Sequence, residues 1–143
     1  MGIWSVPLAA IAAFAAASAW YMALAGRWVA ATGRSEAELR AGGVALPMAI
    51  AFAGYLLVAA MLRHILASSG VTGFFACLVA GLGVGLFIAA PLILTNYAFA
   101  RQPPPLWWID AGHAVLACTA IGAVLGLAGL RDVPQGGRSA HPQ

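Results

Sequence analysis

The chain has 143 residues, of which 63% are hydrophobic and only 8% are charged, and its formal net charge is +3. A soluble domain carries about 25% charged residues, so this composition excludes a water-soluble globular fold, whose surface needs more polar side chains. The seven basic residues, all Arg, are too few and too scattered for a nucleic-acid surface. We therefore expect one domain whose solvent is the lipid bilayer.

Four apolar stretches are long enough to cross about 30 Å of hydrocarbon, which takes about 20 helical residues each. They run approximately over residues 3–25, 46–62, 71–97 and 106–130. Backbone polar groups in lipid must be paired within the segment, so we expect helices; none of the stretches alternates as a β-barrel strand does. The sequence predicts an all-α, integral membrane four-helix bundle over residues 1–133 and a disordered tail over 134–143.

The first apolar stretch begins without the basic residues of a signal peptide and is too long for one, so we expect it to remain as a span. After it comes the longest connection, residues 26–45. There, Ser35 and Glu38 have the spacing of a capping box. This spacing predicts a short surface helix over residues 36–40.

Four spans place both chain ends on one side of the membrane. The arginines near the span ends divide three against four between the two sides: Arg63, Arg131 and Arg138 against Arg27, Arg34, Arg40 and Arg101. Basic residues are enriched in cytoplasmic loops, but three against four does not decide the orientation. We expect termini outside and a cytoplasmic connection at 26–45.

Small residues recur at four-residue spacing along the spans, which lets helix backbones approach closely in lipid. Gly81 and Gly85 mark the third span, and Gly122 and Gly126 mark the fourth. We expect these glycines to pack helices together, and Pro91 to kink the third helix, because its ring displaces a backbone hydrogen bond. The opposite face of the fourth span carries ionisable residues, so it needs either a cavity or a second copy of the chain.

Both cysteines, Cys77 and Cys118, lie inside apolar stretches, and no Cys or His spacing typical of a metal site occurs. A buried Cys packs as a small hydrophobic residue. We predict no disulfide, no metal site and no cofactor.

The stretch WWIDAGHAVL, residues 107–116, places Asp110 and His113 on one face of the fourth helix. The first and third spans end where the fourth begins, so other polar and aromatic residues gather at the same end. The candidate polar site comprises Asp110, His113, Asn96, Tyr97, Trp20, Tyr21, Arg27 and Arg101. His64, beside Arg63, falls at the other end, where we expect it to contact lipid head groups.

Two interpretations of Asp110 and His113 are open. In the structural one, Asp110 caps and orients the fourth helix, and the neighbouring side chains satisfy one another. In the functional one, the pair binds a proton or a ligand, because ionisable groups inside a membrane are costly and His titrates near neutral pH. Two ligands are too few for a metal without a second subunit.

Three segments carry a resemblance to a known family. They are SAWYMALAGRW in the first span, TGRSEAEL in the connection and LTNYAFARQPPPLWWIDAGHAVLACTAIGAVLG in the C-terminal half. Together they resemble the domain of unknown function 1761 family of small bacterial membrane proteins. The resemblance implies four spans and assigns no activity. With the composition, it leads us to expect a multi-pass protein of the bacterial cytoplasmic (inner) membrane.

Our leading hypothesis for function is a small binding or permeation module that uses Asp110 and His113. The alternative is a structural or interaction subunit of a larger membrane complex. The third hypothesis is a membrane enzyme acting on a lipid-like substrate, which needs a cavity beside His113. No nucleophile–base arrangement is visible in the sequence, so a non-enzymatic function is favoured.

Overall fold

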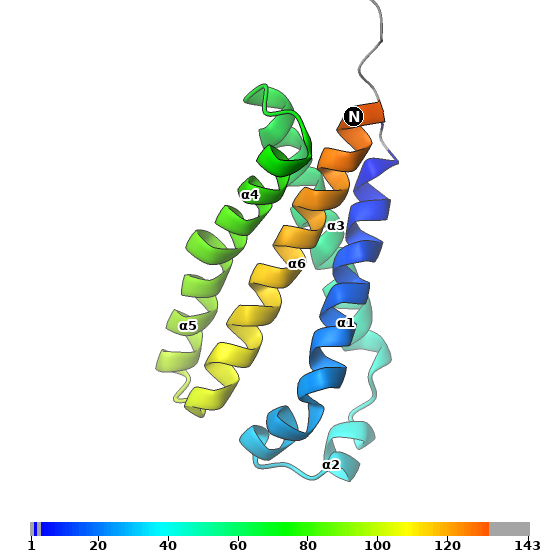
Figure 1. Ribbon diagram of the computed structural model, residues 1–143. Coiled ribbons are helices and arrows are strands. Elements are labelled where there is room, and N and C mark those ends of the chain that lie inside the picture. The colour runs from blue at the N-terminus through cyan, green and yellow to red at the C-terminus, as the bar shows by residue number, and fades with distance from the viewer. Residues whose placement is uncertain (1, 3, 132–143) are drawn as a thin grey trace, which may run out of the picture.

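The computed structural model describes Gly2 and residues 4–131, and the tail predicted at 134–143 lies outside this range. The described chain is helical. Its elements are α1 (Ser5–Thr32), α2 (Glu36–Ala41), α3 (Ala45–Ser68), α4 (Phe74–Val84), the π-helical turn η1 (Gly85–Ala89), α5 (Ala90–Phe99) and α6 (Pro104–Arg131). Since α4, η1 and α5 follow one another directly, the chain forms four long rods that run alternately up and down (Figure 1).

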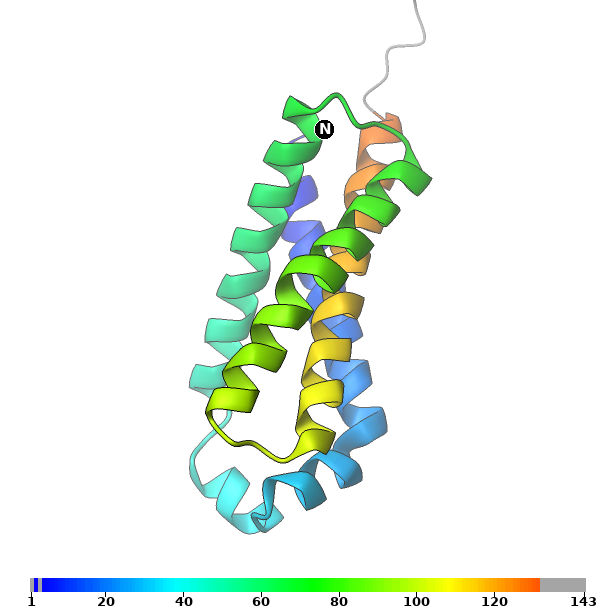
Figure 2. The same ribbon diagram turned by 90° about the vertical axis from the view of Figure 1, so that its left-hand side faces the viewer.

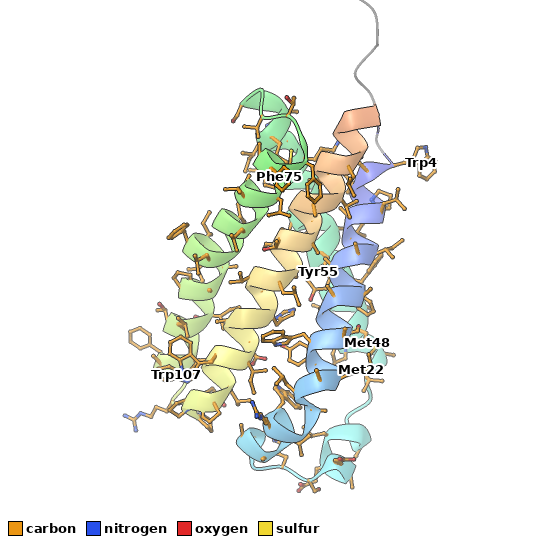
Figure 3. The ribbon with its side chains drawn as sticks, in the orientation of Figure 1. Trp4, Met22, Met48, Tyr55, Phe75 and Trp107 are labelled. Atoms are coloured by element: carbon orange, nitrogen blue, oxygen red, sulfur yellow. The ribbon has the colours of Figure 1, made fainter. Side chains whose placement is uncertain are left out.

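Each of the four rods is long and apolar enough to cross a membrane, with mean hydropathies of 1.8, 2.1, 2.5 and 1.8 in chain order. Large apolar side chains point outward on them; Leu57 is 73% exposed and Phe75 is 79% exposed. Trp4 lies at one end of the bundle and Trp107 at the other (Figure 3), as interfacial aromatic residues do. The protein is therefore an all-α, multi-pass membrane bundle.

Two helices extend beyond the apolar stretches that predicted them. The helix α1 continues to Thr32 and α3 continues to Ser68, whereas the predicted spans end at residues 25 and 62. A glycine with positive φ follows each helix, Gly33 at 66° and Gly70 at 65°. The helices thus continue past the first polar residues until glycine adopts the left-handed conformation that stops them.

A capping box opens α2, which is one residue longer than the helix expected at 36–40. The backbone N–H and the hydroxyl of Ser35 donate to Glu38 Oε2 at 2.8 and 2.7 Å. In return, the Glu38 N–H donates to Ser35 Oγ at 3.3 Å. The hydrogen bond from the Ser35 backbone N–H and, to a smaller extent, the one from its hydroxyl lower the pKa of the Glu38 carboxyl. We call the end of the bundle that carries α2 the loop end, and the opposite end the terminal end (Figure 1).

The central helix of the bundle is α6. It contacts α1, α3 and all three segments of the third rod, whereas α3 packs mainly against α1 and α6 (Figure 2). In the most apolar stretch of each span, 44% of the residues are buried in α6 and only 11% in α3. A polar residue on α6 is therefore approached by other spans from several sides.

Glycines bring α4 and α6 into direct backbone contact. A Cβ on Gly122 would overlap the carbonyl oxygen of Cys77, and a Cβ on Gly81 would come within 3.0 Å of Gly122 Cα. A Cβ on Gly85 or Gly126 would lie 2.7 or 2.9 Å from a Cα of the facing helix. The four glycines thus lie at one helix crossing, where a side chain would push the backbones apart.

Small and branched apolar residues fill the bundle around and beyond this crossing, toward the terminal end. This core consists of Ala9, Ala13, Ala59, Leu62, Leu66, Cys77, Ala117, Ile121 and Leu125. Both cysteines of the chain, Cys77 and Cys118, are buried and free.

Just before Pro91, where the sequence predicts a kink, the third rod contains a π-helical turn. The N–H of Ala90, the residue before Pro91, donates to the carbonyl of Gly85, five residues back instead of four. The wider turn accommodates a proline whose ring would otherwise meet a carbonyl of the preceding turn. The third rod therefore continues through Pro91 and carries α5 along α6.

We expect Gly122→Ala to lower the free energy of unfolding by about 1–3 kcal/mol, because its new methyl group overlaps the Cys77 carbonyl. The measurement is unfolding in mixed detergent micelles. The control is Gly83→Ala on α4, where a Cβ meets nothing within 4 Å. Equal losses in the two variants would contradict the backbone contact.

Candidate functional site

Asp110 is a buried carboxylate on α6, with only 7% of its surface exposed. The hydroxyl of Tyr21 on α1 donates to its Oδ1 at 2.6 Å, and the hydroxyl of Tyr97 on α5 donates to its Oδ2 at 2.7 Å. Because each oxygen accepts a phenolic proton, the arrangement fits the ionised, acceptor-only form of the side chain. The lengths are those of hydrogen bonds to a charged oxygen, which are stronger than neutral ones.

One turn deeper on α6, His113 is bonded through both ring nitrogens. Its Nδ1 lies 3.3 Å from the backbone carbonyl of Asp110, and its Nε2 lies 2.5 Å from the hydroxyl of Tyr55 on α3. A carbonyl only accepts, so Nδ1 carries the proton, and in the neutral ring Nε2 then accepts from Tyr55. The His113 ring also lies against Tyr21, with centroids 5.0 Å apart.

All four spans meet in this polar cluster, which consists of Tyr21, Tyr55, Tyr97, Asp110 and His113. The three tyrosines are the only ones in the chain, and each donates to or contacts an ionisable residue of α6. A carboxylate and an imidazole in a bilayer need partners from the protein, because lipid tails offer none. The cluster supplies those partners and ties α1, α3 and α5 to α6.

Trp20 fixes the approach of α1 to α6 beside the cluster. Its indole N–H donates to the carbonyl of Ile109 at 2.9 Å. Its ring lies over Gly112, where a Cβ would come within 2.8 Å of the ring. The glycine therefore leaves the space in which Trp20 packs, and Tyr21 follows directly on α1.

The structure brings together five of the eight residues of the predicted site: Trp20, Tyr21, Tyr97, Asp110 and His113. It places the other three, Asn96, Arg27 and Arg101, at exposed positions. Asn96 is exposed because it lies about 100° around α5 from Tyr97, which turns toward α6. Arg101 lies in the turn after α5, at φ 52°.

Tyr55 of α3 belongs to the cluster but is not among the residues that the sequence predicts for the site. This residue is the one tyrosine of the second span. It lies near the middle of α3, so its place along the helix does not assign it to the loop end. Its signal was composition: a lone phenol inside an otherwise apolar stretch needs a polar partner. His113 is that partner.

A cavity of about 660 Å³ lies between α1, α2 and the first half of α3. Its lining includes Phe14, Tyr21, Trp28, Leu39, Met48 and Tyr55. The rings of Tyr21 and Tyr55 therefore face the cavity, while their hydroxyls reach Asp110 and His113. Two of the five residues of the polar cluster thus form part of the wall of this apolar chamber at the loop end.

A second cavity, of about 500 Å³, lies outside the cluster between α1 and α6. Arg27 and Trp108 line it, together with Ala30, Ala31, Pro105 and Ile109. An exposed Arg beside an exposed Trp at a span end is typical of the membrane interface. This position separates Arg27 from the cavity that Tyr21 and Tyr55 line.

The ionisable groups of the cluster are one carboxylate, one imidazole and three phenols. Within the described residues, no group of three or more His, Cys, Asp or Glu side chains is placed to hold a metal ion. The hydroxyl of Ser18, which lines the larger cavity, donates to the Phe14 carbonyl of its own helix at 2.8 Å. A carbonyl is no general base, so this hydroxyl lacks the partner that an activated nucleophile needs.

Comparison with known proteins identifies the family. Residues 4–126, most of the chain, match a family described as "Protein of unknown function (DUF1761)". The chain belongs to this family. The matched range of this DUF1761 protein includes every residue of the polar cluster and of both cavities. No curated protein and no solved structure matched it.

We expect Tyr97→Phe to lower the free energy of unfolding by about 1.5–3 kcal/mol, the range for a hydrogen bond to a charged group. The neighbouring variant Asn96→Ala, at an exposed position, should change it by less than about 0.5 kcal/mol. Unfolding of both variants in mixed micelles gives the comparison. A Tyr97→Phe protein as stable as Asn96→Ala would mean that the phenol does not hold Asp110.

Proposed function

We propose that this DUF1761 protein is a small binding module of the bacterial inner membrane. Its ligand is an apolar or amphipathic molecule that occupies the cavity between α1, α2 and α3. One observation carries the proposal: both phenols on the cavity wall, Tyr21 and Tyr55, are hydrogen-bonded to the buried ionisable pair Asp110 and His113. A purely structural pair needs partners, but those partners need not face an open chamber.

The rim of the cavity supports access from the lipid. Met22 is 73% exposed and Met48 is 51% exposed, and both line the cavity (Figure 3). Flexible thioether side chains adapt to varied apolar shapes. At the loop end, Leu39 of α2 forms part of the lining. A molecule from the bilayer would pass the two methionines and reach the phenols with its polar end.

The packing of the terminal end favours binding over permeation. Beyond Tyr55, the space between the helices is occupied by Ala13, Ala59 and Leu62, which are at most 2% exposed. A conducting path would have to pass through this core and the glycine crossing of α4 and α6. The cavity is therefore better suited to hold a molecule than to transmit one.

A bulky side chain that fills the cavity should exclude the ligand. We expect Ala51→Phe, whose ring would project into the cavity, to reduce the bound ligand at least ten-fold relative to the wild type. The readout is mass spectrometry of organic extracts from protein that was purified in a mild detergent.

The matched control is Ala53→Phe, an exposed position of the same helix that lies outside the cavity lining. It should retain the ligand at the wild-type level. If both variants carry the same molecules as the wild type, those molecules are surface lipid and the proposal is wrong.

A further inference from the structure

The walls of the larger cavity are rich in aromatic rings. Phe14, Tyr21, Trp28 and Tyr55 all line it. They form edge-to-face pairs, with centroids 6.3 Å apart for Phe14 and Tyr55 and 6.3 Å apart for Tyr21 and Trp28. The face of an aromatic ring attracts a cation, most strongly for Trp and when water is excluded.

One of these rings, that of Tyr21, is hydrogen-bonded to a negative charge. Asp110 lies directly behind Tyr21, and its hydrogen-bond donors are neutral phenols instead of arginines. Among the described residues that line the cavity, none is charged. Arg27, the one basic residue of α1, lines the separate cavity with Trp108. In an apolar surrounding the field of a carboxylate is weakly screened, so it extends into the chamber.

The hydrogen-bonding capacity of the two phenols also favours a cation. Tyr21 gives its proton to Asp110. In the neutral tautomer that places the His113 proton on Nδ1, toward the Asp110 carbonyl, Tyr55 gives its proton to Nε2. Each oxygen then offers only lone pairs to a molecule in the cavity. Lone pairs meet a donor or a positive charge favourably, whereas an anionic or acceptor-only head would find no proton there.

We propose that the cavity between α1, α2 and α3 binds a monovalent organic cation with an apolar body. The body lies against Phe14 and Met48, and the charge lies among the rings of Tyr21, Trp28 and Tyr55. The Asp110 carboxylate supplies the countercharge from behind Tyr21. This inference rests on the proposed binding function and adds the charge of the ligand to it.

The test compares two ions of the same shape and opposite charge, tetraphenylphosphonium and tetraphenylborate. Each is radiolabelled and added to the full protein in phosphatidylcholine nanodiscs, with empty nanodiscs as the background. We expect saturable binding of tetraphenylphosphonium that is abolished by Ala51→Phe and retained in Ala53→Phe. We expect no saturable binding of tetraphenylborate.

Two variants test the source of the preference. Asp110→Asn should weaken tetraphenylphosphonium binding at least ten-fold, because it removes the countercharge. Trp28→Leu keeps an apolar side chain and all hydrogen bonds of the polar cluster, and should weaken binding several-fold through the lost cation–π contact. This second variant keeps the test decisive if Asp110→Asn does not fold.

Saturable tetraphenylborate binding that Ala51→Phe abolishes would overturn the preference for cations while supporting the binding function. Absence of saturable binding of either ion would overturn the inference. In that case the extraction experiment with Ala51→Phe and Ala53→Phe decides separately whether the cavity holds a ligand.

Discussion

A carboxylate in hydrocarbon is stable only if the protein replaces the hydrogen bonds of water, and the rest of the site follows from how Asp110 meets this condition. Its two oxygens accept from Tyr21 and Tyr97, which come from different spans on either side of α6. Truncating either donor leaves a buried charge partly unsatisfied. Asp110 thereby selects one arrangement of α1 and α5 around the central helix, and it places the ring of Tyr21 on the cavity wall.

The small residues make this arrangement sterically attainable. Gly81 and Gly122 let the backbones of α4 and α6 touch, so that the third rod lies along α6 far enough for Tyr97 to reach Asp110. On the other side, Gly112 admits the ring of Trp20, and the next residue is Tyr21. Lipid gives helices little hydrophobic reason to associate, so close backbone packing and polar bonds across helices hold the bundle together. The helix α3 takes part in little of this packing, and the cavity lies on its side of the bundle.

Much of this architecture could be predicted from the sequence, because bilayer thickness and backbone satisfaction leave few alternatives to four helices. The pair Asp110 and His113 could be singled out because ionisable residues are rare in spans. Partner identity was harder to predict. Tyr55 and Asn96 are both polar residues within spans. Only the rotation of each helix about its axis decides that Tyr55 faces His113 and Asn96 faces outward. Residue spacing determines which residues share one face of a helix. It does not determine which face turns toward a neighbouring helix. The cavity was beyond prediction for the same reason.

The most direct test of this account is the infrared spectrum of Asp110 in the folded protein in lipid. Protein labelled with ¹³C at aspartate carboxyl groups is compared at neutral pH with the equally labelled Asp110→Asn variant, so that the difference isolates Asp110. The account predicts a carboxylate stretching band whose frequency shifts in Tyr21→Phe and in Tyr97→Phe, since each variant removes one phenolic donor. A protonated carboxyl band, or a carboxylate band that neither variant shifts, would contradict it.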